Sequence, residues 1–390
     1  MKTSIGKLDG VMQNLFETLP SLTGPAYTQC VVHNYELLLC GGYQNNECYS
    51  YHTLKKQYKR ICSYPKTFIL REHCVIKLAS KNKNEIILLS FGGSINCTLM
   101  MRYVSVWNDE KKKEEIAIED IKQINSNKWV PFTDNNNNPI NIEEKQGDYA
   151  EARAIVGGSN NTLLFITYPP HGIDVFDLAS FQRVYRDNLP TGWIRFHCFL
   201  SRTGNGLTIT NKKHEMLLFC GNEGLSMEYD EDNKTFQFNK LPVAATIKPY
   251  HRYGCVYVDE FIFFFGGADY WNVLKTMHVF SMQEMQWIKF DNFFFSPVCN
   301  CIAVLNEYNA TIHLIGGQDG NGNELSGHMK LNVKDLKGQC AGAYEIRREI
   351  QAMKKEMNKL GQELQIKKLK KVEFFFFATF MEERLIKIKK

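Results

Sequence analysis

The stretch Phe261-Ile-Phe-Phe-Phe-Gly-Gly267 is an apolar run that ends in a small dipeptide, and this arrangement occurs six times in the chain. The other dipeptides are, in chain order, Gly41-Gly42, Gly92-Gly93, Pro169-Pro170, Gly221-Asn222 and Gly316-Gly317. The steps between successive dipeptides are 51, 77, 52, 45 and 50 residues. A buried strand followed by a tight turn explains the pattern, because glycine adopts the positive φ that such a turn requires.

A repeat of this length with four short strands in each unit is typical of a β-propeller. One four-stranded sheet cannot bury both of its faces alone, and stacking of the units supplies the missing contacts. The sequence therefore predicts an all-β fold, a six-bladed propeller over residues 12–336. We expect its dipeptide turns near positions 41, 92, 169, 221, 266 and 316.

The sixth unit lacks the outer strand that the other units possess. Elsewhere this strand carries an aromatic residue and often ends in a proline, as at Leu189-Pro190 and Leu241-Pro242. One segment of this kind, Leu15-Phe16-Glu-Thr-Leu19-Pro20, precedes the first unit. We therefore expect the N-terminal segment to complete the last sheet near Leu331 and to close the ring, which leaves no open sheet edge.

These features together resemble the kelch-repeat family, whose propeller is similar to the central domain of galactose oxidase. The shared features are an arginine or histidine that opens the first strand, a hydrophobic run into Gly-Gly, an aromatic third strand, and a late aromatic followed by Leu-Pro. The third and fourth dipeptides depart from Gly-Gly. The resemblance implies a protein-binding role, either as a substrate receptor for a ubiquitin-ligase subunit or as a scaffold for a cytoskeletal protein.

Charge is distributed unevenly along the chain. Residues 337–390 hold 14 Lys and Arg against 7 Asp and Glu, whereas the rest is nearly neutral, with 33 against 35. The long interval contains a charged and asparagine-rich insertion at 108–148, which we expect to be a solvated loop or short helix, with a partner-binding arm as the alternative. The twelve cysteines follow the repeat rather than a metal-ligand spacing, so we expect them to pack as small hydrophobic residues.

The C-terminal segment predicts a helix over 343–371 with a short coiled-coil seam. The seam consists of apolar residues spaced alternately four and three apart: Ile346, Ile350, Met353, Met357, Leu360 and Leu364. Self-association through 346–364 is the preferred interpretation, and a single helix is the alternative. The basic and aromatic tail at 372–390 leaves open a weak contact with an anionic membrane surface.

No catalytic motif is present in the sequence. It contains no GxSxG, HExxH, P-loop or paired CxxC motif. The alternative function is a propeller enzyme that uses the central mouth, similar to the copper oxidases, but histidines such as His33, His73 and His197 fall within strands. We therefore expect a non-enzymatic interaction module that needs no cofactor or metal.

The candidate partner-binding residues lie in the turns after the dipeptides and at the starts of the first strands, because loops on a rigid ring vary freely while the strands hold them. They are Tyr43, Gln44, Arg71, Ser94, His171, Arg195, Asn222, Arg252, Asp269, Tyr270, Trp271, Gln318 and Asp319. The alternative is that the arginines only bond neighbouring blades. The expected partner is a protein and not a nucleic acid. Because no apolar stretch is long enough for a signal peptide or a membrane helix, we expect a cytoplasmic protein.

Overall fold

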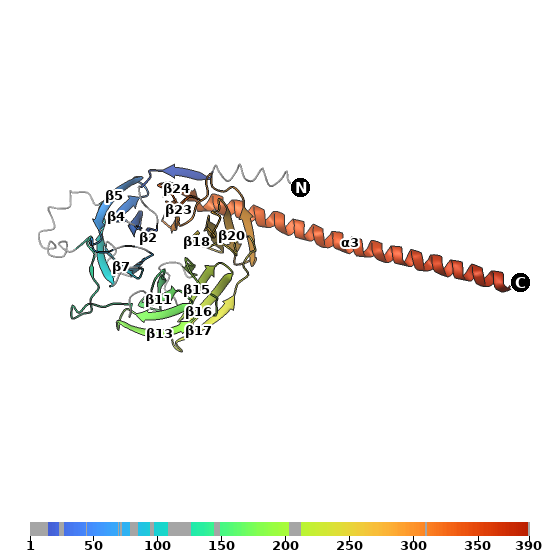
Figure 1. Ribbon diagram of the computed structural model, residues 1–390, viewed down its shortest axis with the longest axis horizontal. Coiled ribbons are helices and arrows are strands. Elements are labelled where there is room, and N and C mark those ends of the chain that lie inside the picture. Colours follow the sequence, from blue (N-terminus) through green and yellow to red (C-terminus); the bar gives the residue numbers. More distant parts are fainter. Residues whose placement is uncertain are drawn as a thin grey trace. The chain divides into compact units, whose positions relative to one another are not determined.

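The computed structural model describes most of the chain (Figure 1). The described residues are 15–22, 27–43, 45–68, 70, 72–78, 85–93, 97–107, 126–143, 149–202, 212–308 and 310–388. The chain divides into two compact units, Met1–Leu336 and Lys337–Lys390, which are described in turn.

The first unit is a ring of six four-stranded antiparallel sheets, which confirms the predicted six-bladed propeller (Figure 1). Blade 1 consists of β2 (Gln29–His33), β3 (Glu36–Gly42), β4 (Asn45–His52) and β5 (Gln57–Ser63). Blade 2 consists of β6 (Cys74–Leu78), β7 (Glu85–Phe91), β8 (Leu99–Val104) and β9 (Val130–Pro131). Blade 3 consists of β10 (Arg153–Gly157), β11 (Leu163–Tyr168), β12 (Gly172–Asp177) and β13 (Gln182–Asn188).

Blade 4 consists of β14 (Cys198–Ser201), β15 (Lys213–Cys220), β16 (Glu223–Asp230) and β17 (Thr235–Lys240). Blade 5 consists of β18 (Gly254–Val258), β19 (Phe261–Phe265), β20 (Met277–Ser281) and β21 (Gln286–Phe290). Blade 6 consists of β22 (Ile302–Asn306), β23 (Thr311–Ile315), β24 (His328–Asn332) and the N-terminal β1 (Phe16–Leu19). The first strand of each blade contacts the first strands of its neighbours, so these six strands surround the axis.

The N-terminal strand closes the ring as predicted. β1 pairs with β24 so that Phe16 faces Leu331 and Leu19 faces His328. The ring of Phe16 also packs against two aromatic side chains that follow blade 5, with centroid distances of 4.8 Å to Phe293 and 5.9 Å to Phe294. The closure therefore combines a backbone ladder with apolar contacts.

The hydrophobic core lies between adjacent blades. Leu38 of blade 1 packs in one cluster with Leu88 and Met101 of blade 2. Phe264 of blade 5 shares another cluster with Leu217 of blade 4. Each sheet thus buries its faces against its neighbours, as the repeat pattern requires.

The cysteine prediction is wrong at two positions. Cys198 on β14 and Cys255 on β18 form a disulfide, because the first strands of blades 4 and 5 bring their Cα atoms to 6.5 Å. The remaining cysteines are free and mostly buried, in agreement with a packing role.

Part of the predicted insertion at 108–148 belongs to blade 2. Residues 126–143 are described and include β9 and the buried Trp129. The segments 108–125 and 144–148, on which the loop and partner-arm interpretations rest, lie outside the described residues.

The second unit is helical. The helix α3 (Val333–Ile388) begins where the side chain of Asn332 accepts a hydrogen bond from the backbone N–H of Lys334 at 2.8 Å, a typical N-cap. It is longer than the predicted 343–371 at both ends, and the described part of the predicted tail at 372–390 is helical as far as Ile388. No proline interrupts this segment, and each of its three glycines, Gly338, Gly342 and Gly361, costs only about 1 kcal/mol. Within the described part of the chain, no helix has the length and apolar character that crossing a membrane requires.

Candidate functional site

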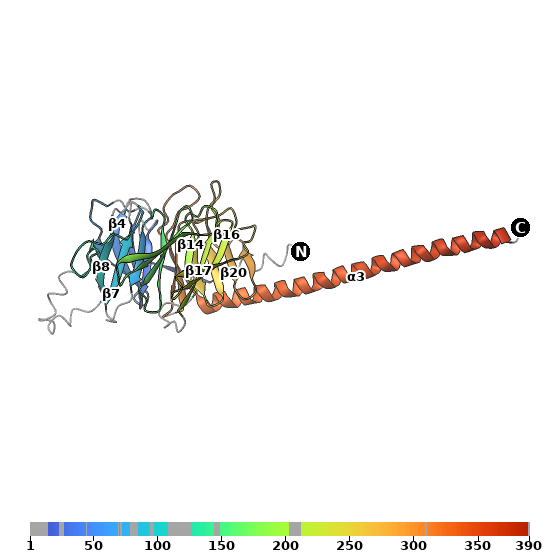
Figure 2. The same ribbon diagram turned by 90° about the horizontal axis from the view of Figure 1, so that it is seen from below.

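One face of the ring gathers most of the predicted site residues. Because neighbouring strands are antiparallel, the turn between the second and third strands and the connection to the next blade lie at the same end of every sheet. Bridge pairing between His251, which precedes β18, and Ala268, which follows β19, joins these two kinds of loop. We call this end, formed by such loops as 189–197, 266–276 and 291–301, the mouth face; Figure 2 shows the loops at the two ends of the strands.

A ring of left-handed residues surrounds the axis at the mouth face. In every blade the residue two positions before the first strand has φ between +45° and +60°, although none of these residues is glycine. These rim residues are Tyr27, Glu72, Glu151, Phe196, Arg252 and Asn300. Such a conformation costs an L-residue of order 1 kcal/mol or more, and it persists only where the surrounding structure imposes it. Here it turns the chain from the outer edge of one blade to the first strand of the next.

A cavity of about 300 Å³ opens between the rim residues and continues along the first strands. Its upper lining includes Tyr27, Glu72, Phe196, Arg252 and Asn300, and its walls come from β2, β14, β18 and β22. Arg153 at the start of β10 and the disulfide of Cys198 and Cys255 also line it. This cavity is the concave feature that the ring geometry produces at the mouth face.

The arginines at the starts of the first strands differ in their partners. Arg195 forms an ion pair with Glu151 of the preceding rim position at 3.4 Å, and the backbone N–H of Phe196 donates to the same carboxylate at 2.9 Å. Arg195 therefore bonds neighbouring blades. Arg252 instead stacks on the ring of Phe196 at 4.3 Å, and it has no carboxylate partner among the described residues.

The histidines near the rim are held in the neutral form. Burial, followed by the charges of Arg252 and Arg195, lowers the pKa of His251 to about 4. Burial, followed by the charge of Arg153, holds the pKa of His197 well below its usual value. Neutral imidazoles add no positive charge to the mouth, so the positive charges beside these histidines are those of the guanidinium groups.

Aromatic contacts connect the rim to an exposed loop. The rings of Phe196 and His251 are stacked at 5.8 Å, and His251 lies 6.4 Å from Tyr270. Tyr270 and Trp271 are 84% and 91% exposed. The side chain of Asp269 accepts hydrogen bonds from the backbone N–H groups of Trp271 and Asn272 at 2.7 and 2.6 Å, which holds this loop in a tight turn.

Two exposed aromatic residues of the mouth face were missed by the sequence analysis. Trp193 is 75% exposed in the connection from blade 3 to blade 4, and Phe295 is 73% exposed between blades 5 and 6. Backbone bonds hold the Trp193 loop, since Ile194 N–H donates to Pro170 at 2.7 Å. The available signal was their position in the connections that lead into a first strand, whereas the predicted residues lie chiefly in the turns after the dipeptides.

The other predicted residues are distributed around the mouth face. The described ones are Tyr43, His171, Gln318 and Asp319, in the turns that follow their dipeptides, and Asn222, the second residue of the Gly221-Asn222 dipeptide. Gln318 contacts the rim, because the side chain of Asn300 donates to it at 2.9 Å. Gln44, Arg71 and Ser94 lie outside the described residues.

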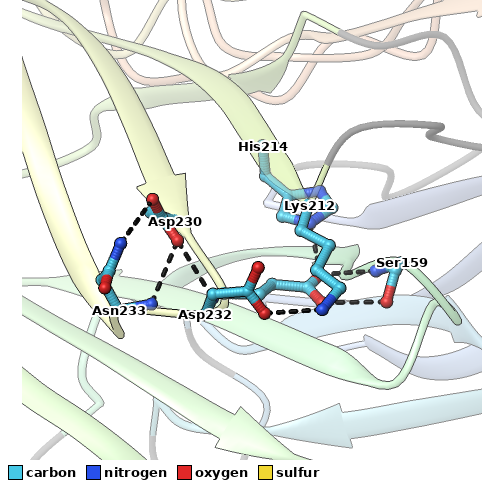
Figure 3. A network of polar contacts seen from close by, with 7 residues as sticks. Ser159, Lys212, His214, Asp230, Asp232 and Asn233 are labelled. Atoms are coloured by element: carbon cyan, nitrogen blue, oxygen red, sulfur yellow. Dashed lines mark hydrogen bonds and ion pairs between the residues drawn. The ribbon is translucent and has the colours of Figure 1, made fainter.

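A polar cluster at the opposite end of the strands contains residue types found in hydrolases (Figure 3). Glu231 accepts hydrogen bonds from the hydroxyl of Ser159 at 2.8 Å and contacts the imidazole of His214. The carboxylate thus lies between serine and histidine, whereas nucleophilic catalysis requires the histidine next to the serine. This cluster links blade 3 to blade 4. Among the described residues, no group of three or more His, Cys, Asp or Glu side chains is arranged to hold a metal ion.

The fold and the mouth face define the chain as a six-bladed β-propeller with a central cavity. Among solved structures, one titled "Structure of YjhT" matches with a TM-score of 0.55 and 12% sequence identity. The match covers 81% of this chain and 97% of that one, and at this identity it shows the fold alone. No family model matches the sequence, and no curated protein matches it.

Proposed function

We propose that this chain is a kelch-type, non-enzymatic interaction module that binds a protein partner through the mouth face. The observation that supports the proposal is the set of four aromatic side chains, 73–91% exposed, on that face: Trp193, Tyr270, Trp271 and Phe295. Tryptophan and tyrosine are the residue types that most often dominate binding energy at protein interfaces. Exposing them to water has no benefit for the stability of the ring.

Among the described residues, the large hydrophobic side chains of the opposite face are less exposed. They are 37–62% exposed: Tyr35, Leu54, Met285 and Tyr308. Tyr35 and Tyr308 also pack against each other, with ring centroids 5.5 Å apart. The difference between the two faces favours the mouth face as the binding surface.

Anchored loops favour binding, because less conformational entropy is lost when the partner docks. The Trp271 loop is held by Asp269, and the Trp193 loop is bonded on both sides, to Pro170 and, through Gly192 N–H, to Glu223 at 3.2 Å. The partner class that the kelch resemblance implies, a ubiquitin-ligase or cytoskeletal protein, and a cytosolic location stay predictions.

The experiment compares capture of cellular proteins by the full-length chain and by face variants. Trp271→Ala and Trp193→Ala should each weaken binding of the captured partner by about tenfold or more, whereas Tyr308→Ala on the opposite face should not. Equal capture by all variants would contradict the proposal. Stoichiometric copper in the purified protein would instead favour the copper-oxidase-like alternative.

We also propose that α3 pairs with a second copy of the chain through Ile346–Leu364. The six seam residues are 42–71% exposed and follow a heptad spacing, which is the pattern of a helix that lacks its apolar partner. Sedimentation should give a dimer for the wild type and for Gln351→Lys, which adds a charge outside the seam, and a monomer for Met353→Lys. An identical monomer mass for all three would refute the pairing.

A further inference from the structure

We propose that the cavity at the mouth binds a small monocarboxylate whose body is apolar. This goes beyond capture of a protein by the outer loops, because the ligand would lie between the rim residues and the first strands. The carboxylate would bind to Arg153 and Arg252, and the body would extend along the walls.

The two cavity arginines are available to bind an anion. The guanidinium group of Arg153 donates to the carbonyl of Ala152 at 3.0 Å, and that of Arg252 stacks on the ring of Phe196. Neither pairs with a carboxylate in the described part of the chain, and Nε of Arg252 is buried without an acceptor. By contrast, Arg186 is paired with Asp174 at 2.9 Å.

The charge of the lining favours an anion. The cavity lining contains two guanidinium groups and one acidic residue, Glu72. The buried His197 beside Arg153 is neutral. Guanidinium groups bind carboxylates through paired hydrogen bonds, which are stronger where water is partly excluded. A ligand with one carboxylate therefore matches the charge of the two arginines.

The walls below the rim carry several apolar side chains. Leu200 on β14 and Ile302, Ala303 and Val304 on β22 line the cavity and are only partly buried by the protein. Cys30 on β2 completes this surface from blade 1. Contact with a hydrocarbon or aromatic body would remove this surface from water, which stabilises the complex.

The dimensions favour a small molecule over a peptide. A volume of about 300 Å³ is at the lower end of ligand pockets, and the lower walls are strands of four blades. A peptide would reach only the rim. Binding of an acidic peptide is therefore the competing outcome of the test.

The experiment titrates the full-length protein with sodium hexanoate in a calorimeter and compares hexanamide and hexylamine, which share the body but lack the negative charge. We expect hexanoate to bind at least about tenfold more tightly than either, because only the anion can pair with both arginines. Equal binding of hexanoate and hexanamide, or no binding of hexanoate, would overturn the proposal.

Variants locate the site. Arg252→Gln and Arg153→Gln should each weaken hexanoate binding by about tenfold or more, while Arg202→Gln should leave it unchanged. Arg202 is the matched control, because it pairs with Glu215 at 2.7 Å beyond the far end of β14. Unchanged hexanoate binding in both cavity variants would contradict the assignment of this cavity as the binding site.

If tetraglutamate peptide binds through Arg252 and hexanoate does not, the arginines serve a protein ligand and the proposal is wrong. If either variant fails to fold, the comparison of hexanoate, hexanamide and hexylamine binding to the wild-type protein still tests the proposal.

Discussion

At Gly317 the backbone has a φ of +106°, and a Cβ atom there would lie 2.6 Å from the carbonyl oxygen of Cys299. Gly92 is similar, with a φ of +74° and 2.6 Å to the carbonyl oxygen of Tyr149. Tyr149 belongs to the backbone that enters the next blade, whereas Cys299 belongs to the backbone that enters the same blade as Gly317. The dipeptide turns therefore need glycine for backbone conformation and for close contact with the connections between blades.

Replacing Gly317 by alanine should destabilise the propeller by about 1–3 kcal/mol, because the new side chain is strained and meets a backbone atom. Chemical unfolding of the full-length chain measures this free energy. Gly320→Ala is the control, since a Cβ there meets nothing within 4 Å, and its effect should be much smaller. Equal effects of the two substitutions would contradict this explanation of the dipeptide.

Blade 6 contains a buried pair of histidines. The hydroxyl of Tyr58 lies 2.7 Å from Nδ1 of His328, whose Nε2 lies 2.8 Å from Nδ1 of His313. Burial lowers the pKa of His313 to about 4 and that of His328 to about 3. The charges of Lys330, which lowers the pKa of His313, and Glu17, which raises it, are smaller influences.

The free energy of unfolding should therefore decrease as the pH falls. Both folded-state pKa values lie below the ordinary 6.5, so the stability that the neutral pair contributes is complete above 6.5 and is lost toward pH 4 and 3. Urea unfolding at about pH 7 and about pH 5 measures the change. In His313→Gln the difference in unfolding free energy between the two pH values should be smaller. An unchanged difference would exclude the histidine pair as the source of the pH dependence.

At the scale of the elements, the strands were largely predictable, because each apolar run and its dipeptide carry a local signal. The left-handed rim was not, since Tyr27, Glu72, Phe196 and Asn300 share no residue type that marks a positive φ. The disulfide was missed because a pairing between blades depends on spatial proximity. The length of α3 was underestimated because the seam pattern ends before the helix does.

The disulfide between β14 and β18 can be tested by counting the cysteines that react before and after reduction. Alkylation of the unfolded, unreduced protein should modify ten cysteines, and alkylation after reduction should modify all twelve. Cys198→Ser should lower the free energy of unfolding by roughly 2–4 kcal/mol, because the bond closes a long loop in the unfolded chain. Twelve modified cysteines before reduction would show that the bond is absent.

At the scale of the whole molecule, the count of repeats predicted the ring, and the unmatched outer strand predicted its closure. The pairing of Phe16 with Leu331 confirms the latter. The mouth face was predicted only in part. Its dipeptide turns follow from the repeat, whereas exposure of Trp193 and Phe295 depends on how the connections between blades fold.

We propose that the mouth face is the binding surface of the propeller. Hydrogen exchange of the full-length chain, measured alone and with its captured partner, tests this proposal, because it reports each loop separately. We predict slower exchange in 189–197, 268–276 and 291–301 on binding. Slower exchange confined to the opposite-face loops at 34–35, 53–56 and 282–285 would contradict the account.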